Sequence, residues 1–169
     1  MSGEPAGSAA GPRGAERPLT PGEIDLARSV FGTAIDWQPV RIRRRRWFPL
    51  QPRNTVMAPC GHLHFHPGSE LYRDDFAAAS HALQGLFLHE MTHVWQTQVR
   101  GRWYLPLMRH PLSRYDYALR PGWTLERYGL EQQAEIVRHV FLLRMGAQVP
   151  GAPPLDSYRG ILPFKPARA

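Results

Sequence analysis

His89, Glu90 and His93 form the pattern His-Glu-x-x-His, which has the clearest potential for chemistry in this sequence. Apolar residues recur around the pattern at near-helical spacing and Gly101 follows as a stop, so we predict a helix over residues 80–100. On a helix, histidines at positions i and i+4 share one face, about 6 Å apart along the axis, and both can reach one zinc ion. A neighbouring glutamate can accept a proton from zinc-activated water. The pattern predicts a zinc hydrolase; the alternative is a buried helix whose histidines find hydrogen-bond partners.

A catalytic zinc site needs a third protein ligand, and a second predicted helix, over residues 125–145, offers candidates. The metzincin class has a Gly and a third His at fixed offsets after the first motif. This sequence has Gln96 and Val99 at those offsets, so that class is excluded. Glu131 and Glu135 share one face of the second helix and border its apolar stripe. Burying two acids there is costly unless they meet a partner, and zinc and a histidine N–H are such partners.

The segments His89-Glu-Met-Thr-His-Val-Trp-Gln96 and Glu131-Gln-Gln-Ala-Glu135 resemble the gluzincin type of zinc metallopeptidase. In particular they resemble the proteins labelled Vgr-related, and the peptidase-like domain of contractile-injection-system proteins. The resemblance covers about residues 19–164. It implies that Zn²⁺ is held by three side chains: His89, His93 and Glu131. It also implies Glu90 as the general base and Glu135 as an acid that holds a ligating imidazole, at a position where gluzincins usually have Asp.

The expected function is therefore that of a zinc-dependent metallopeptidase or amidase acting on a peptide or protein. One alternative is a non-catalytic zincin-like module that serves as an interaction or structural component, with a partner in a secretion apparatus. Another is nucleic-acid binding by the arginine strip 41–46. We disfavour nucleic acid as a partner, because no zinc-finger or Gly-aromatic framework accompanies the strip, which suits a solvated or charged strand edge equally well.

Size, charge and cysteine content limit the remaining possibilities. The 169 residues and 19.3 kDa suit one domain, and the net charge of +7 comes almost entirely from arginine, with Lys165 the only lysine. Arginine-rich surfaces bind phosphates and carboxylates, although genomic base composition produces the same bias. Cys60 is the only cysteine, which excludes internal disulfides and a cysteine-rich zinc site. Without a transmembrane run or a signal peptide, we expect a cytoplasmic protein that does not use membranes, unless a non-classical machine exports it.

We predict one α+β domain of zincin-like fold, with a small antiparallel sheet packed on the zinc-binding helix pair. Its expected limits are residues 19–164, with a disordered tail over 1–18, a Pro-rich extension from about 147 and a short tail over 165–169. A first helix should begin after the capping box Thr20-Pro-Gly-Glu23 and end at Gly32.

The strands and the long connection supply the remaining candidate site residues. Residues 40–47 should begin as a strand, and 54–66 should form a hairpin with His62, His64 and His66 on one face. Those three span about 13 Å, too far for one metal ion, although His64 or His66 could line a substrate cleft. The connection over 101–123 joins the two ligand helices and supplies candidate donors for an oxyanion. The candidates are Tyr115, Tyr117, Arg120 and Tyr128, with Tyr128 the first choice, because it precedes Glu131 on the same predicted stripe; the alternative is simple aromatic packing.

Overall fold

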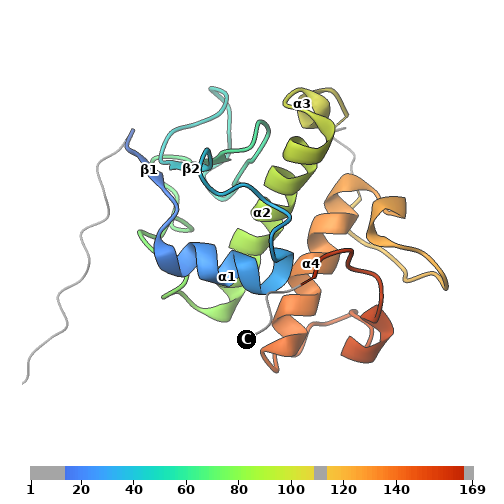
Figure 1. Ribbon diagram of the computed structural model, residues 1–169. Coiled ribbons are helices and arrows are strands. Elements are labelled where there is room, and N and C mark those ends of the chain that lie inside the picture. Colours follow the sequence, from blue (N-terminus) through green and yellow to red (C-terminus); the bar gives the residue numbers. More distant parts are fainter. Residues whose placement is uncertain (1–13, 109–113, 166–169) are drawn as a thin grey trace, which may run out of the picture.

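The computed structural model describes residues 14–108 and 114–165, and in these ranges the chain has four α-helices and a three-stranded sheet (Figure 1). The expected α+β class is therefore confirmed. In chain order the elements are β1 (Glu16–Pro18), α1 (Pro21–Phe31), β2 (Arg41–Arg43), β3 (Leu63–His64), α2 (His81–Arg100), α3 (Tyr104–Met108), the 3-10 helix η1 (Leu125–Arg127), α4 (Leu130–Arg144) and the 3-10 helix η2 (Leu155–Tyr158).

The sheet is mixed, so the prediction of an antiparallel sheet is wrong in part. Its strand order is β1-β2-β3, with β1 antiparallel to β2 but β2 parallel to β3. The chain leaves β2 through the long loop 44–62 and returns in the same direction, which a parallel pair requires. The predicted hairpin over 54–66 is reduced to a single bridge between Met57 and His64. The predicted alternation in β2 is confirmed at its apolar face, where Val40 and Ile42 are fully buried.

Residues 16–18, which the sequence suggested belong to a disordered tail, form strand β1. Residues 1–13 of that predicted tail lie outside the described residues. β1 pairs with β2 through its backbone, with Glu16 opposite Arg43, and the two side chains form an ion pair. Because backbone pairing needs no apolar side chains, the hydropathy pattern did not reveal this edge strand.

Helix α1 begins and ends where its sequence predicts. The Thr20 hydroxyl accepts a hydrogen bond from the Glu23 N–H at 3.0 Å, and the Glu23 carboxylate accepts one from the Thr20 N–H at 2.9 Å. Glu23 is fully buried, and it also binds the Arg17 guanidinium and the N–H of Phe76. One cap therefore joins β1 and α1 to the segment that leads into α2, which fixes the start of the motif helix relative to the sheet.

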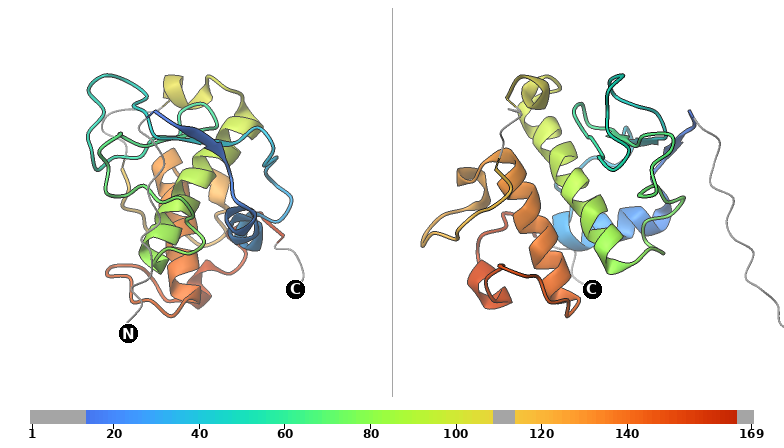
Figure 2. Two further views of the ribbon diagram at one scale, coloured as in Figure 1. Left: turned by 90° about the vertical axis from the view of Figure 1, so that its left-hand side faces the viewer. Right: turned by 180° about the vertical axis from the view of Figure 1, so that it is seen from behind.

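Helix α2 lies between the sheet and α4, and it packs along α4 over most of its length (Figures 1 and 2). It spans His81–Arg100, close to the predicted range 80–100, and Ser80 is its N-cap. Gly85 permits the close approach, because a Cβ at this position would lie 3.3 Å from side-chain atoms of Arg138 and Leu142 on α4. No helix within residues 14–108 or 114–165 is both long and apolar enough to cross a membrane.

The second ligand-bearing helix starts later than predicted. Residues 125–127 form η1, the chain is extended at Tyr128 and Gly129, and α4 begins at Leu130. Gln132 caps the new start, because its side-chain oxygen accepts a hydrogen bond from the Gly129 N–H at 2.9 Å. Tyr128 is therefore not on a helical stripe with Glu131, which removes the basis on which it was chosen. The C-terminal segment ends the domain by burying Tyr158, Ile161 and Phe164.

Candidate metal centre

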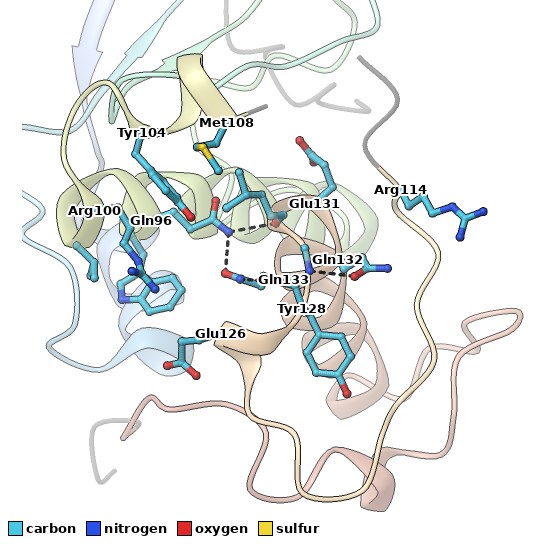
Figure 3. A pocket seen from close by; sticks show the side chains of 14 residues that line it. Gln96, Arg100, Tyr104, Met108, Arg114, Glu126, Tyr128, Glu131, Gln132 and Gln133 are labelled. Carbon is cyan, nitrogen blue, oxygen red and sulfur yellow. Dashed lines mark hydrogen bonds between the residues drawn. The ribbon is translucent and has the colours of Figure 1, made fainter. Parts of the chain in front are cut away.

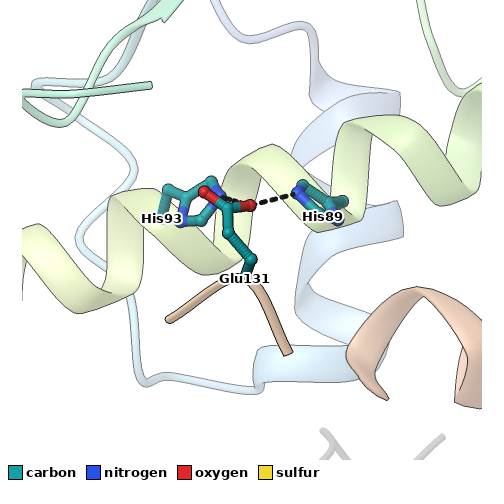
Figure 4. Close-up of side chains that lie close together, drawn as sticks. All are labelled: His89, His93 and Glu131. Carbon is teal, nitrogen blue, oxygen red and sulfur yellow. Dashed lines mark hydrogen bonds and ion pairs between the residues drawn. The ribbon is translucent and has the colours of Figure 1, made fainter. Parts of the chain in front are cut away.

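Helices α2 and α4 bring together the three side chains that the sequence predicts as metal ligands (Figure 4). Oε2 of Glu131 lies 3.3 Å from Nε2 of His89 and 3.2 Å from Nε2 of His93. One ligand atom from each residue lies within 4.8 Å of the other two, and all three residues are buried. Among the histidine, cysteine, aspartate and glutamate side chains of the described residues, these three lie close enough together to bind one metal ion.

The distances and the donor types suit zinc. Zinc binds histidine nitrogen and carboxylate oxygen at about 2.0–2.1 Å, so two ligand atoms at a tetrahedral angle are separated by about 3.3–3.4 Å. The separations of 3.3 and 3.2 Å between Glu131 and the two histidines are close to that value. Two imidazoles and one carboxylate leave a fourth position for water or substrate, as catalytic zinc sites do.

Each histidine of the site is held through its other ring nitrogen, so both Nε2 atoms face Glu131. Nδ1 of His89 lies 2.8 Å from Oε1 of Glu135, and Nδ1 of His93 lies 2.8 Å from the side-chain oxygen of Gln96. Such partners fix the tautomer and the ring orientation of metal-binding histidines. The predicted position of Glu135 beside a ligating imidazole therefore agrees with the geometry, and its side chain is long enough to reach α2.

Gln96 is a functional candidate that sequence reasoning missed. Its amide nitrogen donates hydrogen bonds to the Leu130 carbonyl at 3.1 Å and to the Gln133 side-chain oxygen at 2.9 Å. The same amide that orients His93 therefore also ties α2 to the first turn of α4, which carries Glu131. The available signal was spacing, because Gln96 follows His93 by three residues and shares its helical face.

Glu90, the predicted general base, is buried beside the cluster, with 4% of its surface exposed. Its negative charge contributes to raising the pKa of His89, which indicates that the two groups lie close together. Oε2 of Glu90 is buried and makes no hydrogen bond within residues 14–108 and 114–165. A buried acceptor without a partner is unusual, and it is suited to receive a proton from a ligand that enters the site.

The charge state of His89 gives a prediction for the metal-free protein. Burial lowers the pKa of His89, but the carboxylates of Glu131 and Glu135, which accept hydrogen bonds from the protonated ring, outweigh it and raise the pKa to about 9 from the usual 6.5. A raised folded-state pKa stabilises the fold fully below pH 6.5, and this stabilisation is lost as the pH rises through 9. In the presence of a chelator, we therefore expect the melting temperature of the protein to decrease as the pH is raised from 6.5 to 9.

The same melting curves in saturating zinc provide the comparison. Zinc needs neutral His89, so the bound ion replaces the proton, and the decline between pH 6.5 and 9 should be much smaller. Glu135→Gln removes one of the three carboxylates that raise this pKa, and it should flatten the metal-free curve in the same range. A metal-free melting temperature that is constant or rises from pH 6.5 to 9 would contradict the assignment.

Among the candidate oxyanion donors, Tyr115 lies beside the metal centre. Its half-exposed ring stacks on the His89 ring, with centroids 6.2 Å apart and planes 19° apart. Tyr128, the first choice from sequence, instead uses its hydroxyl to accept a hydrogen bond from the Arg120 N–H at 3.0 Å. Tyr117 is also engaged elsewhere, with His139 and Tyr158. The packing alternative therefore describes Tyr128 better.

A cavity of about 530 Å³ adjoins the centre, with Glu131 in its wall (Figure 3). Its lining is partly apolar and comes from the end of α2, from α3 and from the first turn of α4. The residues that define it are Trp95, Val99, Tyr104, Met108 and Leu130. Arg100 and Glu126 add charges of both signs. The cavity is large enough for a bulky side chain of a substrate bound at the centre.

The histidine row of the predicted hairpin does not join the centre. His64 and His66 are both buried. His64 packs edge-on against Trp47, with ring centroids 5.2 Å apart. Burial, followed by the charge of Arg43, lowers the pKa of His64 to about 4, so it is a neutral core residue near neutral pH.

Comparisons with known proteins identify the family of this chain. No protein-family model matches the sequence. The type VI secretion system spike protein VgrG2b of Pseudomonas aeruginosa is 46% identical over 136 residues, which cover 76% of this chain but 13% of that protein. The solved structure of the effector domain of Pseudomonas aeruginosa VgrG2b superposes with a TM-score of 0.72 and 40% identity, over 88% of this chain and 84% of that one. This chain belongs to the family of the VgrG2b effector domain.

Proposed function

We propose that this chain is a zinc-dependent peptidase or amidase of zincin-like fold that hydrolyses a peptide-like bond. Zn²⁺ would be held by His89, His93 and Glu131, with Glu90 as the general base. The observation that supports this proposal best is that three buried donor atoms lie within 4.8 Å of one another, with the Glu131 oxygen at 3.3 and 3.2 Å from the two histidine nitrogens, close to the separation in a tetrahedral zinc site. Both imidazoles are already oriented by Glu135 and Gln96, so little rearrangement would be needed to bind the ion.

The chain's own residues account for the proton transfers. When bound, Zn²⁺ supplies a Lewis acid that polarises the substrate carbonyl and lowers the pKa of water. Glu90 accepts a proton from the attacking water and returns it to the leaving nitrogen, so that a C–O bond forms as the C–N bond breaks. Tyr115, stacked on His89, is the residue whose hydroxyl would donate to the developing oxyanion.

The comparisons suggest where such an activity would be used. VgrG2b is named as a spike protein of a type VI secretion system, and its related domain is named as an effector domain. The present chain spans 13% of the spike protein's length. We therefore propose that it acts as an effector domain on a peptide or protein target, and that its partner is a component of a secretion apparatus.

Removal and return of the metal test the proposed function. Purified chain would be analysed for zinc by elemental analysis, then dialysed against a chelator, and hydrolysis of fluorescently labelled casein would be followed at each stage. We expect about one zinc ion per chain, loss of hydrolysis in chelator and recovery on adding zinc. Hydrolysis that survives complete removal of the metal would overturn the proposal.

The alternative function is a non-catalytic zincin-like module of a secretion apparatus. The same measurements separate it from the enzyme, because a structural site would retain zinc without hydrolysing any substrate. Among residues 14–108 and 114–165 the centre has two histidines and one glutamate, which leaves a ligand position open; this favours the enzyme, because structural zinc sites use four protein ligands.

A further inference from the structure

A continuous line of polar side chains runs from the candidate metal centre to the C-terminal segment. Oε1 of Glu135 lies 2.8 Å from Nδ1 of His89, and its other oxygen lies 3.1 Å from Nε2 of His139, one turn further along α4. Nδ1 of His139 lies 2.7 Å from the hydroxyl of Tyr117, which lies 2.6 Å from the hydroxyl of Tyr158. Tyr158 ends η2, so these contacts join a predicted ligand to a distant part of the sequence.

The chemistry of the groups gives this line a direction. A carboxylate only accepts hydrogen bonds, so hydrogens on Nδ1 of His89 and on Nε2 of His139 make favourable contacts with the Glu135 oxygens, which lie 2.8 and 3.1 Å away. When His139 is neutral, its Nδ1 accepts a hydrogen bond from the Tyr117 hydroxyl, and the Tyr117 oxygen accepts one from the Tyr158 hydroxyl. In that form both hydroxyls donate in the direction of Glu135. In the neutral form of His89 that a metal ion requires, a hydrogen on Nδ1 leaves the lone pair of Nε2 on the side of Glu131.

The side chains of this line are largely shielded from solvent. The Glu135 side chain is 13% exposed, that of His139 is 19% exposed, and Tyr158 is 4% exposed. Water therefore has little access to replace a lost partner, and a broken bond would leave a buried polar group unpaired. Burial also raises the pKa of Tyr117 and of Tyr158, so both hydroxyls keep the protons that they donate.

Arg138 competes with His89 for the same oxygen of Glu135, and His139 limits the effect of this competition. The Arg138 guanidinium lies 3.3 Å from Oε1, the same oxygen that holds His89. The Arg138 side chain is 35% exposed and can turn toward solvent. His139 binds the opposite oxygen, and this contact fixes the rotation of the carboxylate so that Oε1 stays directed at α2.

We propose that His139 is a positioning residue of the metal centre, and that Tyr117 and Tyr158 extend its support to the C-terminal segment. His139 acts through Glu135 on His89, and it contacts neither metal nor substrate. The inference rests on the metal centre proposed above. Residues 155–158 would therefore contribute to metal retention, although they lie outside both ligand-bearing helices.

The test measures Zn²⁺ affinity by competition with a chromophoric chelator. His139→Ala should weaken binding roughly ten- to hundredfold, the range for partners of metal-binding histidines. His139→Gln keeps an amide donor with similar reach, and it should recover most of that loss. Tyr117→Phe and Tyr158→Phe each remove one hydroxyl, and each should weaken binding about two- to tenfold. His81→Ala, an exposed histidine at the start of α2, is the matched control and should leave the affinity unchanged.

Two further measurements distinguish positioning from general stability. Metal-free melting temperatures show whether a variant is folded, and a purely structural role would weaken zinc binding only as far as the metal-free fold is weakened. In a double-mutant cycle, Tyr158→Phe should have little further effect on affinity once His139→Ala has cut the line. If His139→Ala does not fold, the two Tyr→Phe variants decide the question.

Variants that bind zinc as tightly as the unmodified chain would overturn the proposal, and so would additive effects in the cycle. Because the readout is affinity, it separates this inference from the proposed function. An unmodified chain that binds zinc but hydrolyses nothing contradicts the peptidase and leaves the comparison of variants valid. An unmodified chain that binds no zinc contradicts both.

Discussion

Glu90→Gln is expected to reduce hydrolysis by roughly 10²- to 10⁴-fold, the usual contribution of a general base, while zinc remains bound. The amide has nearly the shape of the carboxylate but cannot accept the proton of the attacking water. Glu90 is buried at 4% exposure, and the neutral amide removes a buried negative charge, so the fold should be kept. Initial rates on labelled casein, together with zinc content by elemental analysis, measure the two effects separately.

An exposed glutamate provides the control for this substitution. Glu70→Gln makes the same chemical change on the surface, and it should leave both the rate and the zinc content unchanged. Equal hydrolysis by the Glu90→Gln variant and the unmodified chain would remove Glu90 from the chemistry. Loss of zinc in Glu90→Gln would instead assign this residue to metal binding.

Glu131→Ala is expected to weaken zinc binding by roughly 10²- to 10³-fold and to remove hydrolysis at limiting zinc. Structural zinc sites bind with roughly 10–16 kcal/mol, so one of four ligands corresponds to about 2.5–4 kcal/mol. The metal-free fold should also lose stability, because the buried carboxylate lies within 3.3 Å of two imidazoles that would lose this partner. Competition with a chelator and thermal melting measure the two consequences.

The matched control for this change is Glu126→Ala on η1. Glu126 is exposed and lines the adjoining cavity, and its removal should leave zinc affinity unchanged. Glu131→Asp keeps the carboxylate but shortens the side chain by one methylene, so an intermediate affinity is expected. Zinc affinity that is unchanged in Glu131→Ala would exclude this residue as a ligand and with it the proposed centre.

Helices α1 and α2 were predictable because their signals are local. The capping box at Thr20 and Glu23 and the stop at Gly32 set the limits of α1, and apolar spacing set those of α2. The start of α4 was not predictable in this way. Its preceding turn is a 3-10 helix that hydropathy does not distinguish from a continuous helix, so the break at Gly129 was missed.

The sheet shows the opposite case. Alternation correctly identified β2, but it could not reveal which strands pair or in which direction. The edge strand β1 is held by backbone hydrogen bonds and by the Glu16–Arg43 ion pair, and neither leaves a hydropathy pattern. Alternation also failed to predict the burial of His64. Polar and apolar residues alternate around it, as on a strand with one face in solvent, but both faces of this segment are buried in the fold.

By itself, the sequence determined the residue types of the centre and the helical spacing that puts His89 and His93 on one face, because that spacing is a property of a single helix. The resemblance added Glu131. Only the tertiary structure decided the partners of these groups: Gln96 on His93, Tyr115 on His89, and the line from Glu135 through His139 to the C-terminal segment. These contacts depend on how α2 and α4 cross and on where the chain returns after α4. No local pattern records such distances, because they follow from packing between segments that are far apart in the sequence.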